Sequence, residues 1–206
     1  MFVGGLSWKI IGGVLAVAVP SVLVFLSIVM QEGQTLIKDY QRDRIMAFFD
    51  PATYADTEAY QQLNSVIAIG SGQLWGKGLN NTHIASVKNG NFLPESQTDF
   101  IFAVIGEELG FVGSAVVILL LILIAMRCVS IARVAKDTAG MVIAAGMGSL
   151  IGIQGFMNIA VATMMMPNTG LPLPFVSYGL SSLVSMYIGI GFVLNVGLQR
   201  KNLYNL

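Results

Sequence analysis

The sequence has few charged residues. Asp, Glu, Lys and Arg make up 11% of the 206 residues, against about 25% in a typical soluble protein. Eleven acids balance eleven bases, hydrophobic residues make up 55%, and the mean hydropathy is +0.74. This composition excludes a disordered chain and a nucleic-acid-binding protein, and it indicates a membrane protein.

Cysteine and histidine are almost absent. The single cysteine, Cys128, excludes an internal disulfide framework and a metal site built from cysteines. The single histidine, His83, has no cysteine or serine motif beside it, so a polar loop residue is a better interpretation than part of a catalytic dyad.

Three runs contain no charged residue: 10–31, 109–126 and 138–199. A membrane-spanning helix needs about 20 mostly apolar residues, and the third run is interrupted by prolines, Asn168 and Gly170. The sequence therefore predicts an all-α polytopic membrane protein, a single membrane domain over 1–206. Its four spans are expected at about 8–30, 100–128, 140–164 and 180–198.

Lysine and arginine gather after the second and fourth predicted spans. Because basic residues favour the cytoplasmic side, we expect the C-terminus and a loop at 129–139 to be cytoplasmic. The loop at 31–99 and the proline-rich loop at 165–179 are then extracytoplasmic. The first apolar run has no cleavage site before Gln31, so it is predicted to be a retained span rather than a signal peptide.

Small residues recur at helical spacing in two of the spans. Such rows allow helices to approach closely in lipid, so they predict packing faces without chemistry. The rows are Gly140, Ala144, Gly148 and Gly152 in the third span, and Gly106, Gly110 and Gly113 in the second.

The predicted loop 31–99 is too long for an idle connection. Asp50-Pro51 indicates a turn or a helix start, and Asp56 is a candidate cap for a short helix. That helix would carry Tyr60, Leu63 and Ile67 on one face.

Lys77 lies among glycines, but the spacing does not fit a nucleotide-binding P-loop. Two interpretations of Lys77 stay open. It is a solvated lysine, or it meets a lipid-linked phosphate as a point charge.

The segment 91–102 places Asp99 at the mouth of the second span. Ser96 and Asp99 match a helix-capping box, whereas a carboxylate at the membrane surface is also able to act as a general base. On a continuous helix Glu107 would lie about 80° round from Asp99 and Glu108 on the opposite face. We therefore expect at most one of these glutamates to share a cavity with Asp99, and the other to pair with a neighbouring helix.

Four segments together resemble the RodA/FtsW/SpoVE family, the SEDS cell-wall polymerases, in order and spacing. The match covers nearly the whole chain. The segments are NFLPESQTDFIFAVIGEELGFVG at 91–113, DYQRDR at 39–44, IAIGSGQLWGKG at 67–78 and TGLPLPFVSYG at 169–179.

The resemblance implies a peptidoglycan glycosyltransferase that polymerises glycan strands from lipid II outside the bacterial cytoplasmic membrane, in elongation, division or sporulation. It implies that Asp99 is catalytic, deprotonating the acceptor sugar hydroxyl or holding a divalent cation (Mg or Mn). A class B penicillin-binding protein, a transpeptidase, is the implied protein partner. The candidate substrate-binding residues are Lys77, Glu95, Thr98, Glu107, Ser177 and Tyr178.

Two positions depart from the family pattern. Gln97 stands where members often have histidine, and Leu180 interrupts the usual Ser-Tyr-Gly-Gly-Ser. The family has about ten spans, and this chain resembles only the last four. We therefore expect a C-terminal fragment or the product of a split gene.

Two other functions stay open. The glutamates within the second span and the broken segment 165–179 are also features of transport sites, which suggests a lipid II flippase. The other alternative is a non-catalytic scaffold for a transpeptidase.

Overall fold

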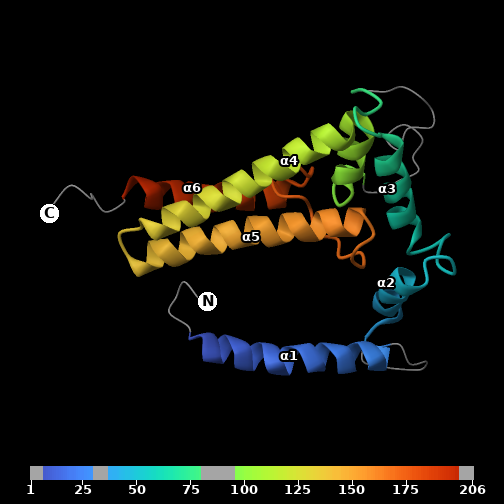
Figure 1. The fold of residues 1–206 in the computed structure, drawn as a ribbon, viewed down its shortest axis with the longest axis horizontal. Coiled ribbons are helices and arrows are strands. Elements are labelled where there is room, and N and C mark those ends of the chain that lie inside the picture. The colour runs from blue at the N-terminus through green and yellow to red at the C-terminus, as the bar shows by residue number, and fades with distance from the viewer. Residues whose placement is uncertain (1–6, 30–36, 80–95, 200–206) are drawn as a thin grey trace. The chain divides into compact units, whose positions relative to one another are not determined.

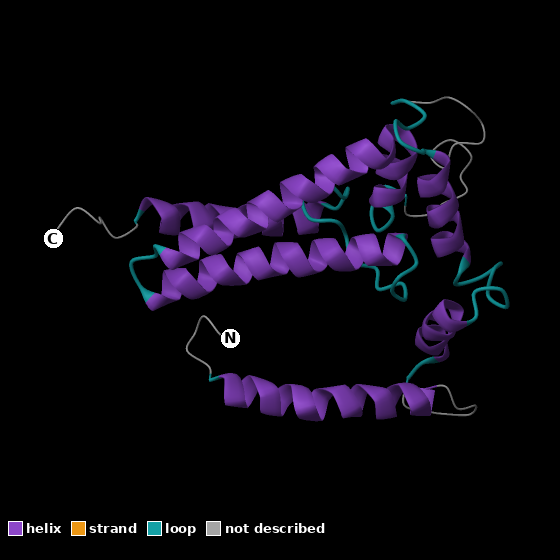
Figure 2. Cartoon of the chain, viewed as in Figure 1, coloured by secondary structure: helices purple, strands orange, loops and turns teal. Residues whose placement is uncertain are grey.

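The structure is a computed structural model that describes residues 7–29, 37–79 and 96–199. Within these ranges every regular element is a helix (Figures 1 and 2). Four of the helices are long and apolar enough to cross a membrane: Lys9–Val29, Ile101–Arg133, Thr138–Ala162 and Leu180–Leu198. The prediction of an all-α chain with four spans is confirmed.

The chain divides into two compact units, Met1–Ala59 and Tyr60–Leu206. The first contains α1 (Trp8–Val29) and α2 (Asp39–Phe49). Arg42 of α2 donates its Nε–H to the carbonyl oxygen of Val29 at 3.2 Å, which satisfies a carbonyl at the end of α1. The sequence did not predict α2 as a helix.

Asp50 ends α2 and begins a turn, one of the two structures that Asp50-Pro51 indicated. Its Oδ2 accepts a hydrogen bond from the Thr53 hydroxyl at 2.6 Å. The hydrogen bonds from Thr53 lower the pKa of the Asp50 carboxyl, because they stabilise its charged form.

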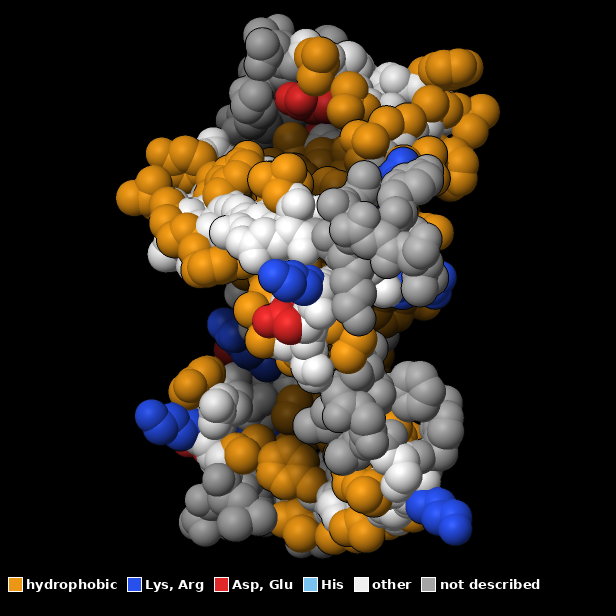
Figure 3. Space-filling model, turned by 90° about the vertical axis from the view of Figure 1, so that its left-hand side faces the viewer, with side chains coloured by type: hydrophobic (Ala, Val, Ile, Leu, Met, Phe, Trp, Pro, Cys, Tyr) orange, Lys and Arg blue, Asp and Glu red, His pale blue; other side chains and the backbone are white. Residues whose placement is uncertain are grey.

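The second unit contains α3 (Tyr60–Ser71), α4 (Ile101–Arg133), α5 (Thr138–Ala162) and α6 (Leu180–Leu198). Helices α4 and α5 lie antiparallel and in extensive contact, and α6 packs against both (Figure 1). Their core is formed mainly by small and branched side chains, including Leu121, Ala144 and Ile151. Many hydrophobic side chains on these helices are exposed, including Leu119, Ile153 and Phe192, as expected of helices that face lipid. Hydrophobic side chains are also prominent on the face seen in Figure 3.

The two rows of small residues have mixed roles. Ala144 is fully buried, and a Cβ added to Gly148 would lie 2.9 Å from the carbonyl oxygen of Ala125 on α4. Gly148 therefore allows close packing of α5 on α4, whereas Gly152 faces open space. Gly110 does not belong to a regular helical face, because it breaks α4.

Helix α3 is the short helix that the sequence predicted, but its buried face is different. Ile67 is 67% exposed, whereas Gln62 and Ser65 are buried. Gln62 donates to the carbonyl oxygens of Val161 (3.0 Å) and Met166 (2.8 Å), and Ser65 donates to that of Ala162 (2.7 Å). The polar face is buried because its side chains bind carbonyl groups at the C-terminal end of α5 and just beyond it.

Candidate functional site

Asp99 lies in a turn, 96–100, that precedes α4. The helix begins at Ile101, with Phe100 at the N-cap and no side-chain cap hydrogen bond. The capping-box interpretation of Ser96 and Asp99 is therefore wrong, because neither residue occupies the required position. The Asp99 side chain is not needed to cap α4, and the residue is only partly buried.

Three consecutive carbonyl groups of this turn each accept a hydrogen bond from a distant part of the chain. Gln97 O accepts from Tyr178 N at 2.8 Å. Thr98 O accepts from the Ser177 hydroxyl at 2.6 Å, and Asp99 O accepts from Asn158 Nδ2 at 2.7 Å. Backbone at the entrance of a membrane helix is thereby paired internally, as a low-dielectric environment requires.

The same donors also hold the loop that connects α5 to α6. Asn158 Nδ2 donates a second hydrogen bond to Leu171 O at 2.7 Å, and Ser177 Oγ accepts one from Leu173 N at 2.7 Å. Asn158 is 1% exposed and Ser177 is 2% exposed. The proline-rich loop and the Asp99 turn are therefore fixed against each other by buried polar groups.

Gly170 lies against the Asp99 carboxylate. A Cβ added to Gly170 would lie 3.5 Å from Asp99 Oδ2, and Gly170 has a φ of +67°. Residue 170 is itself exposed. A side chain here would be strained and would narrow the approach to the carboxylate.

The structure brings together part of the predicted set. Thr98 and Ser177 adjoin Asp99 in this network, Thr98 through its carbonyl group and Ser177 through a buried hydroxyl. The Tyr178 backbone joins the network, although the residue as a whole is 76% exposed. Glu95, like His83, lies outside the described residues.

Lys77 and Glu107 lie at a different feature, a break within α4. Gly110 has φ 66° and ψ −164°, a backbone conformation nearly restricted to glycine. Residues 73–78 insert at this point. Lys77 N donates to Glu107 O (2.9 Å) and Gly78 N to Glu108 O (3.0 Å), while Phe111 N donates to Gln73 O (2.8 Å) and Val112 N to Leu74 O (3.2 Å).

These four bonds replace the two helical bonds that would join residues 111 and 112 to residues 107 and 108. The side chains add an ion pair, with Lys77 Nζ 2.8 Å from Glu107 Oε1. Glu107 is 2% exposed and the Lys77 side chain 32%. Lys77 is therefore not a simple solvated lysine, and Glu107 pairs with a loop rather than with a neighbouring helix.

The angles predicted between Asp99 and the two glutamates assumed one continuous helix, and this premise does not hold because Asp99 precedes α4. Glu108 instead lines a hollow of about 420 Å³, to which Gln97 and Tyr178 also contribute. This hollow adjoins the Asp99 turn through Gln97, and its lining includes both carboxylate and amide groups.

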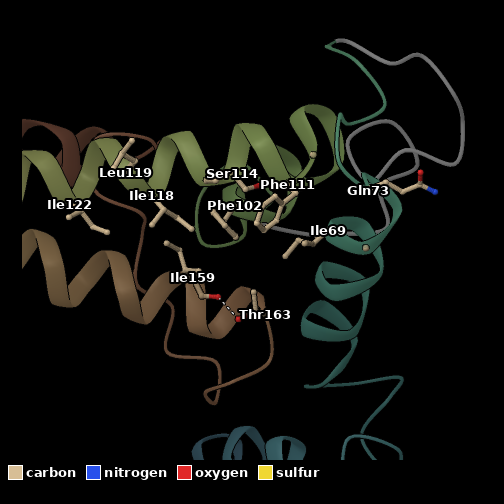
Figure 4. Close-up of a pocket in the computed structure, with 13 residues that line it drawn as sticks. Ile69, Gln73, Phe102, Phe111, Ser114, Ile118, Leu119, Ile122, Ile159 and Thr163 are labelled. Atoms are coloured by element: carbon tan, nitrogen blue, oxygen red, sulfur yellow. Dashed lines mark hydrogen bonds between the residues drawn. The ribbon is translucent and has the colours of Figure 1, made fainter.

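A second hollow, a groove of about 620 Å³, is lined by apolar side chains of α3, α4 and α5 (Figure 4). Ile69, Phe102, Phe111 and Ile159 are among them, and Asp99 is not. The buried Ser114 hydroxyl has no hydrogen-bond partner among the described residues. The groove is suited to an apolar occupant and is separate from the carboxylate.

Two residues of the site were missed by the sequence reasoning, Asn158 and Gly170. Asn158 is one of a few polar residues in a mostly apolar predicted span, a signal that commonly marks hydrogen bonding between helices. Gly170 was noted only as part of a helix-breaking segment. Its relation to Asp99 depends on the folding of the loop.

The described residues contain no group of three or more His, Cys, Asp or Glu side chains able to hold a metal ion. A cation at Asp99 would therefore complete its shell with other oxygen atoms. Magnesium sites commonly have this composition, with one or two carboxylates, water and substrate phosphates.

The helical fold, the four apolar spans and the buried polar network define an integral membrane protein with a carboxylate at one helix entrance. A family model described as "Cell cycle protein", FtsW/RodA/SpoVE, matches residues 1–202. The chain belongs to this family and is a multi-pass bacterial membrane protein.

The curated relatives that the chain matches include proteins named peptidoglycan glycosyltransferase or probable peptidoglycan glycosyltransferase. The chain is 42% identical over 203 residues to the peptidoglycan glycosyltransferase MrdB of Escherichia coli, covering 98% of this chain and 52% of that protein. It is 39% identical over 204 residues to the probable peptidoglycan glycosyltransferase FtsW of Nitrosomonas europaea, covering 98% and 49%. The chain spans about half the length of these relatives.

The chain is also similar to a chain of a solved structure, which is described as "Structural coordination of polymerization and crosslinking by a peptidoglycan synthase complex". The match has a TM-score of 0.68 and 30% sequence identity, and it covers 97% of this chain and 51% of the other.

Proposed function

We propose that this chain is the catalytic part of a peptidoglycan glycosyltransferase that polymerises glycan strands from lipid II. The observation that carries the proposal is the placement of Asp99. Asp99 is only partly buried, its side chain does not cap α4, and its carboxylate lies beside Gly170, while the turn that contains it accepts three long-range hydrogen bonds. The names of the relatives support the same activity.

In the proposed reaction Asp99 acts as a general base. Its carboxylate takes the proton of the acceptor sugar hydroxyl as that oxygen forms a bond to the anomeric carbon of the donor. The bond from the anomeric carbon to the pyrophosphate oxygen breaks, and its electron pair leaves with undecaprenyl pyrophosphate. A positioned general base contributes typically about 10²–10⁴-fold to a rate.

The orientation follows from this chemistry and from the basic residues. We place Asp99, residues 31–99 and the loop 165–179 outside the cytoplasm, and the C-terminus inside. A class B penicillin-binding protein would crosslink the product as a transpeptidase partner. The proposed polymerase would act in bacterial cell elongation, division or sporulation.

In a second form of the proposal, Asp99 binds a divalent cation instead of acting as the base. The Asp99 carboxylate would hold Mg²⁺ or Mn²⁺ while the substrate pyrophosphate supplied further oxygen ligands. The cation would neutralise charge on the leaving group. Removal of divalent cations with a chelator, followed by their return, should then abolish and restore polymer formation.

The test uses this chain assembled with the part of the Escherichia coli relative that it does not match, which we call the reconstituted enzyme. Lipid II is supplied and glycan polymer is measured. We expect Asp99→Asn, which keeps the shape of the side chain and removes the base, to lower the rate by at least about 100-fold.

The matched control is Asp56→Asn, because Asp56 is an exposed carboxylate in a turn of the described chain. This variant should polymerise lipid II at the parent rate. Equal rates for Asp99→Asn and the parent would overturn the role of Asp99.

A flippase is the alternative that a specific observation favours, since α4 is broken beside the buried Glu107. Broken helices and intramembrane carboxylates are found at transport sites. Here residues 73–78 occupy the break through four hydrogen bonds, an arrangement that favours a structural role. Lipid II reorientation in vesicles, with polymerisation blocked by Asp99→Asn, would support transport; its absence would exclude it.

A scaffold without catalysis would behave differently again. Asp99→Ala would then leave cell-wall synthesis intact as long as the complex with the transpeptidase forms.

A further inference from the structure

We propose that Asn158 is a positioning residue that sets the distance between the Asp99 carboxylate and the opposing loop at Gly170. This inference rests on the proposed function of Asp99. The buried amide group of Asn158, on α5, would thereby fix the width of the space in which the acceptor hydroxyl meets the Asp99 carboxylate.

The amide nitrogen of Asn158 joins both walls of this space. It donates one hydrogen bond to Asp99 O and one to Leu171 O, each at 2.7 Å. Leu171 directly follows Gly170, whose added Cβ would lie 3.5 Å from Asp99 Oδ2. One planar group with two N–H donors therefore fixes the backbone on either side of the carboxylate.

Asn158 is itself held in place. It is 1% exposed and lies on α5, four residues before the end of that helix. Two accepting carbonyl groups require that the nitrogen, not the oxygen, faces them. Hydrogen bonds in such a buried environment are stronger than in water, so the amide has little freedom to shift.

The other end of the Asn158 side chain gives a second indication. Its Oδ1 is buried and has no hydrogen-bond partner among the described residues. Burying an unpaired polar atom is unfavourable, so an asparagine is poorly explained by packing alone. The two donated hydrogen bonds are what an apolar side chain of similar size could not supply.

The Asp99 turn has further supports that do not involve Asn158. Ser177 binds Thr98 O and Tyr178 N binds Gln97 O. We therefore expect the turn to form without Asn158, but with the Asp99 carboxylate displaced relative to Gly170. A misplacement of about 1 Å at a reacting group can cost about 100-fold in rate.

The experiment measures kcat and KM for lipid II with the reconstituted enzyme carrying Asn158→Leu. We expect kcat to fall by about 100-fold, with KM changed by less than about threefold, because the variant misplaces the base without removing a substrate contact. A loss confined to KM would overturn the proposal.

The matched control is Gln154→Leu. Gln154 lies one turn earlier on α5 and its Nε2 donates to Pro172 O at 2.9 Å, so it binds the same loop without binding the Asp99 turn. We expect a similar decrease in thermal stability but a decrease in kcat of less than about fivefold. Equal losses of kcat in the two variants would overturn the proposal, since general packing of the loop would explain both.

A second variant, Asn158→Gln, keeps the amide donors and moves them by one methylene. It is designed to fold where Asn158→Leu does not, and its kcat should fall by about tenfold at nearly constant KM. Parent kcat in this variant, with the protein folded, would overturn the proposal. Full activity of Asp99→Asn would reject the proposed function of Asp99, on which this inference rests. Loss of activity in Asp99→Asn together with parent kcat in the Asn158 variants would reject only the positioning role of Asn158.

Discussion

Lys77 and Glu107 are joined twice, once through their backbones and once through their side chains. Lys77 N donates to Glu107 O at 2.9 Å, and Lys77 Nζ lies 2.8 Å from Glu107 Oε1. The two residues connect the segment 73–78 to the broken part of α4. They therefore hold an irregular stretch of backbone inside a helix that is otherwise long enough to span a membrane.

Removing one partner of this ion pair should lower the free energy of unfolding more than removing both partners. Lys77→Met takes the ammonium group away from a carboxylate that is 2% exposed. We expect a loss of about 3 kcal/mol in the free energy of unfolding, at the low end for a buried pair because Lys77 is one-third exposed. The double variant Lys77→Met/Glu107→Leu should recover much of this loss, as measured by denaturation in detergent.

Lys136→Met is the control for the loss of a lysine, because Lys136 is exposed in the turn between α4 and α5. Its effect should stay within about 0.5 kcal/mol. A double variant less stable than Lys77→Met would contradict the expected coupling.

The break in α4 should require glycine at residue 110. Gly110→Ala would combine a positive φ with a Cβ placed 2.7 Å from Leu74 O, so we expect it to destabilise the protein by several kcal/mol or to prevent folding. Gly146→Ala, in open space on α5, should be neutral or stabilise by up to about 1 kcal/mol. The yield and melting temperature of the two variants provide the comparison, and a stable Gly110→Ala protein would show that the break is not obligatory.

The buried polar face of α3 should contribute to stability. Ser65→Ala removes the hydroxyl that donates to Ala162 O at 2.7 Å and leaves that buried carbonyl without this donor. We expect a loss of about 1–3 kcal/mol. Ser185→Ala is the control, because the exposed Ser185 hydroxyl binds a carbonyl of its own helix, that of Ser181. Equal stability of the two variants by thermal denaturation would contradict this role of Ser65.

Gly170 should control access to the carboxylate. Gly170→Ala places a methyl group 3.5 Å from Asp99 Oδ2 at a residue with φ +67°. The substitution would strain the backbone by about 1–2 kcal/mol or more and would narrow the approach to the Asp99 carboxylate. We therefore expect polymer formation to fall by at least about tenfold. Gly179→Ala, in the same loop with φ −151°, should retain most of the activity. Full activity of Gly170→Ala in the reconstituted enzyme would show that this wall does not limit the substrate.

Much of the helical architecture was predictable because hydrophobic runs are local. The charge-free stretches, and the prolines, Asn168 and Gly170 that interrupt the third of them, placed the four long helices without reference to the rest of the chain. The end of α4 was less accurate, since the helix continues to Arg133, five residues beyond the prediction. The charge-free run ends at Met126, so the pattern of charges placed the end of this helix too early.

The site was predictable only in part. Asp99 was selected from its position and from the family motif, but its supposed role as a helix cap was wrong because α4 begins two residues later. The polar face of α3 was also misjudged. An amphipathic pattern assumes that apolar side chains are buried, whereas Gln62 and Ser65 are buried by hydrogen bonding to α5.

The sequence by itself determined that this is a helical membrane protein, because the cost of placing charge in lipid depends on the composition of each short segment. Only the tertiary structure decided what holds Asp99. Asn158 is 59 residues away from Asp99 along the chain, and Ser177 is 79 residues away from Thr98. Such partners are selected by packing and by the need to pair buried backbone groups, so no local pattern in the sequence specifies them.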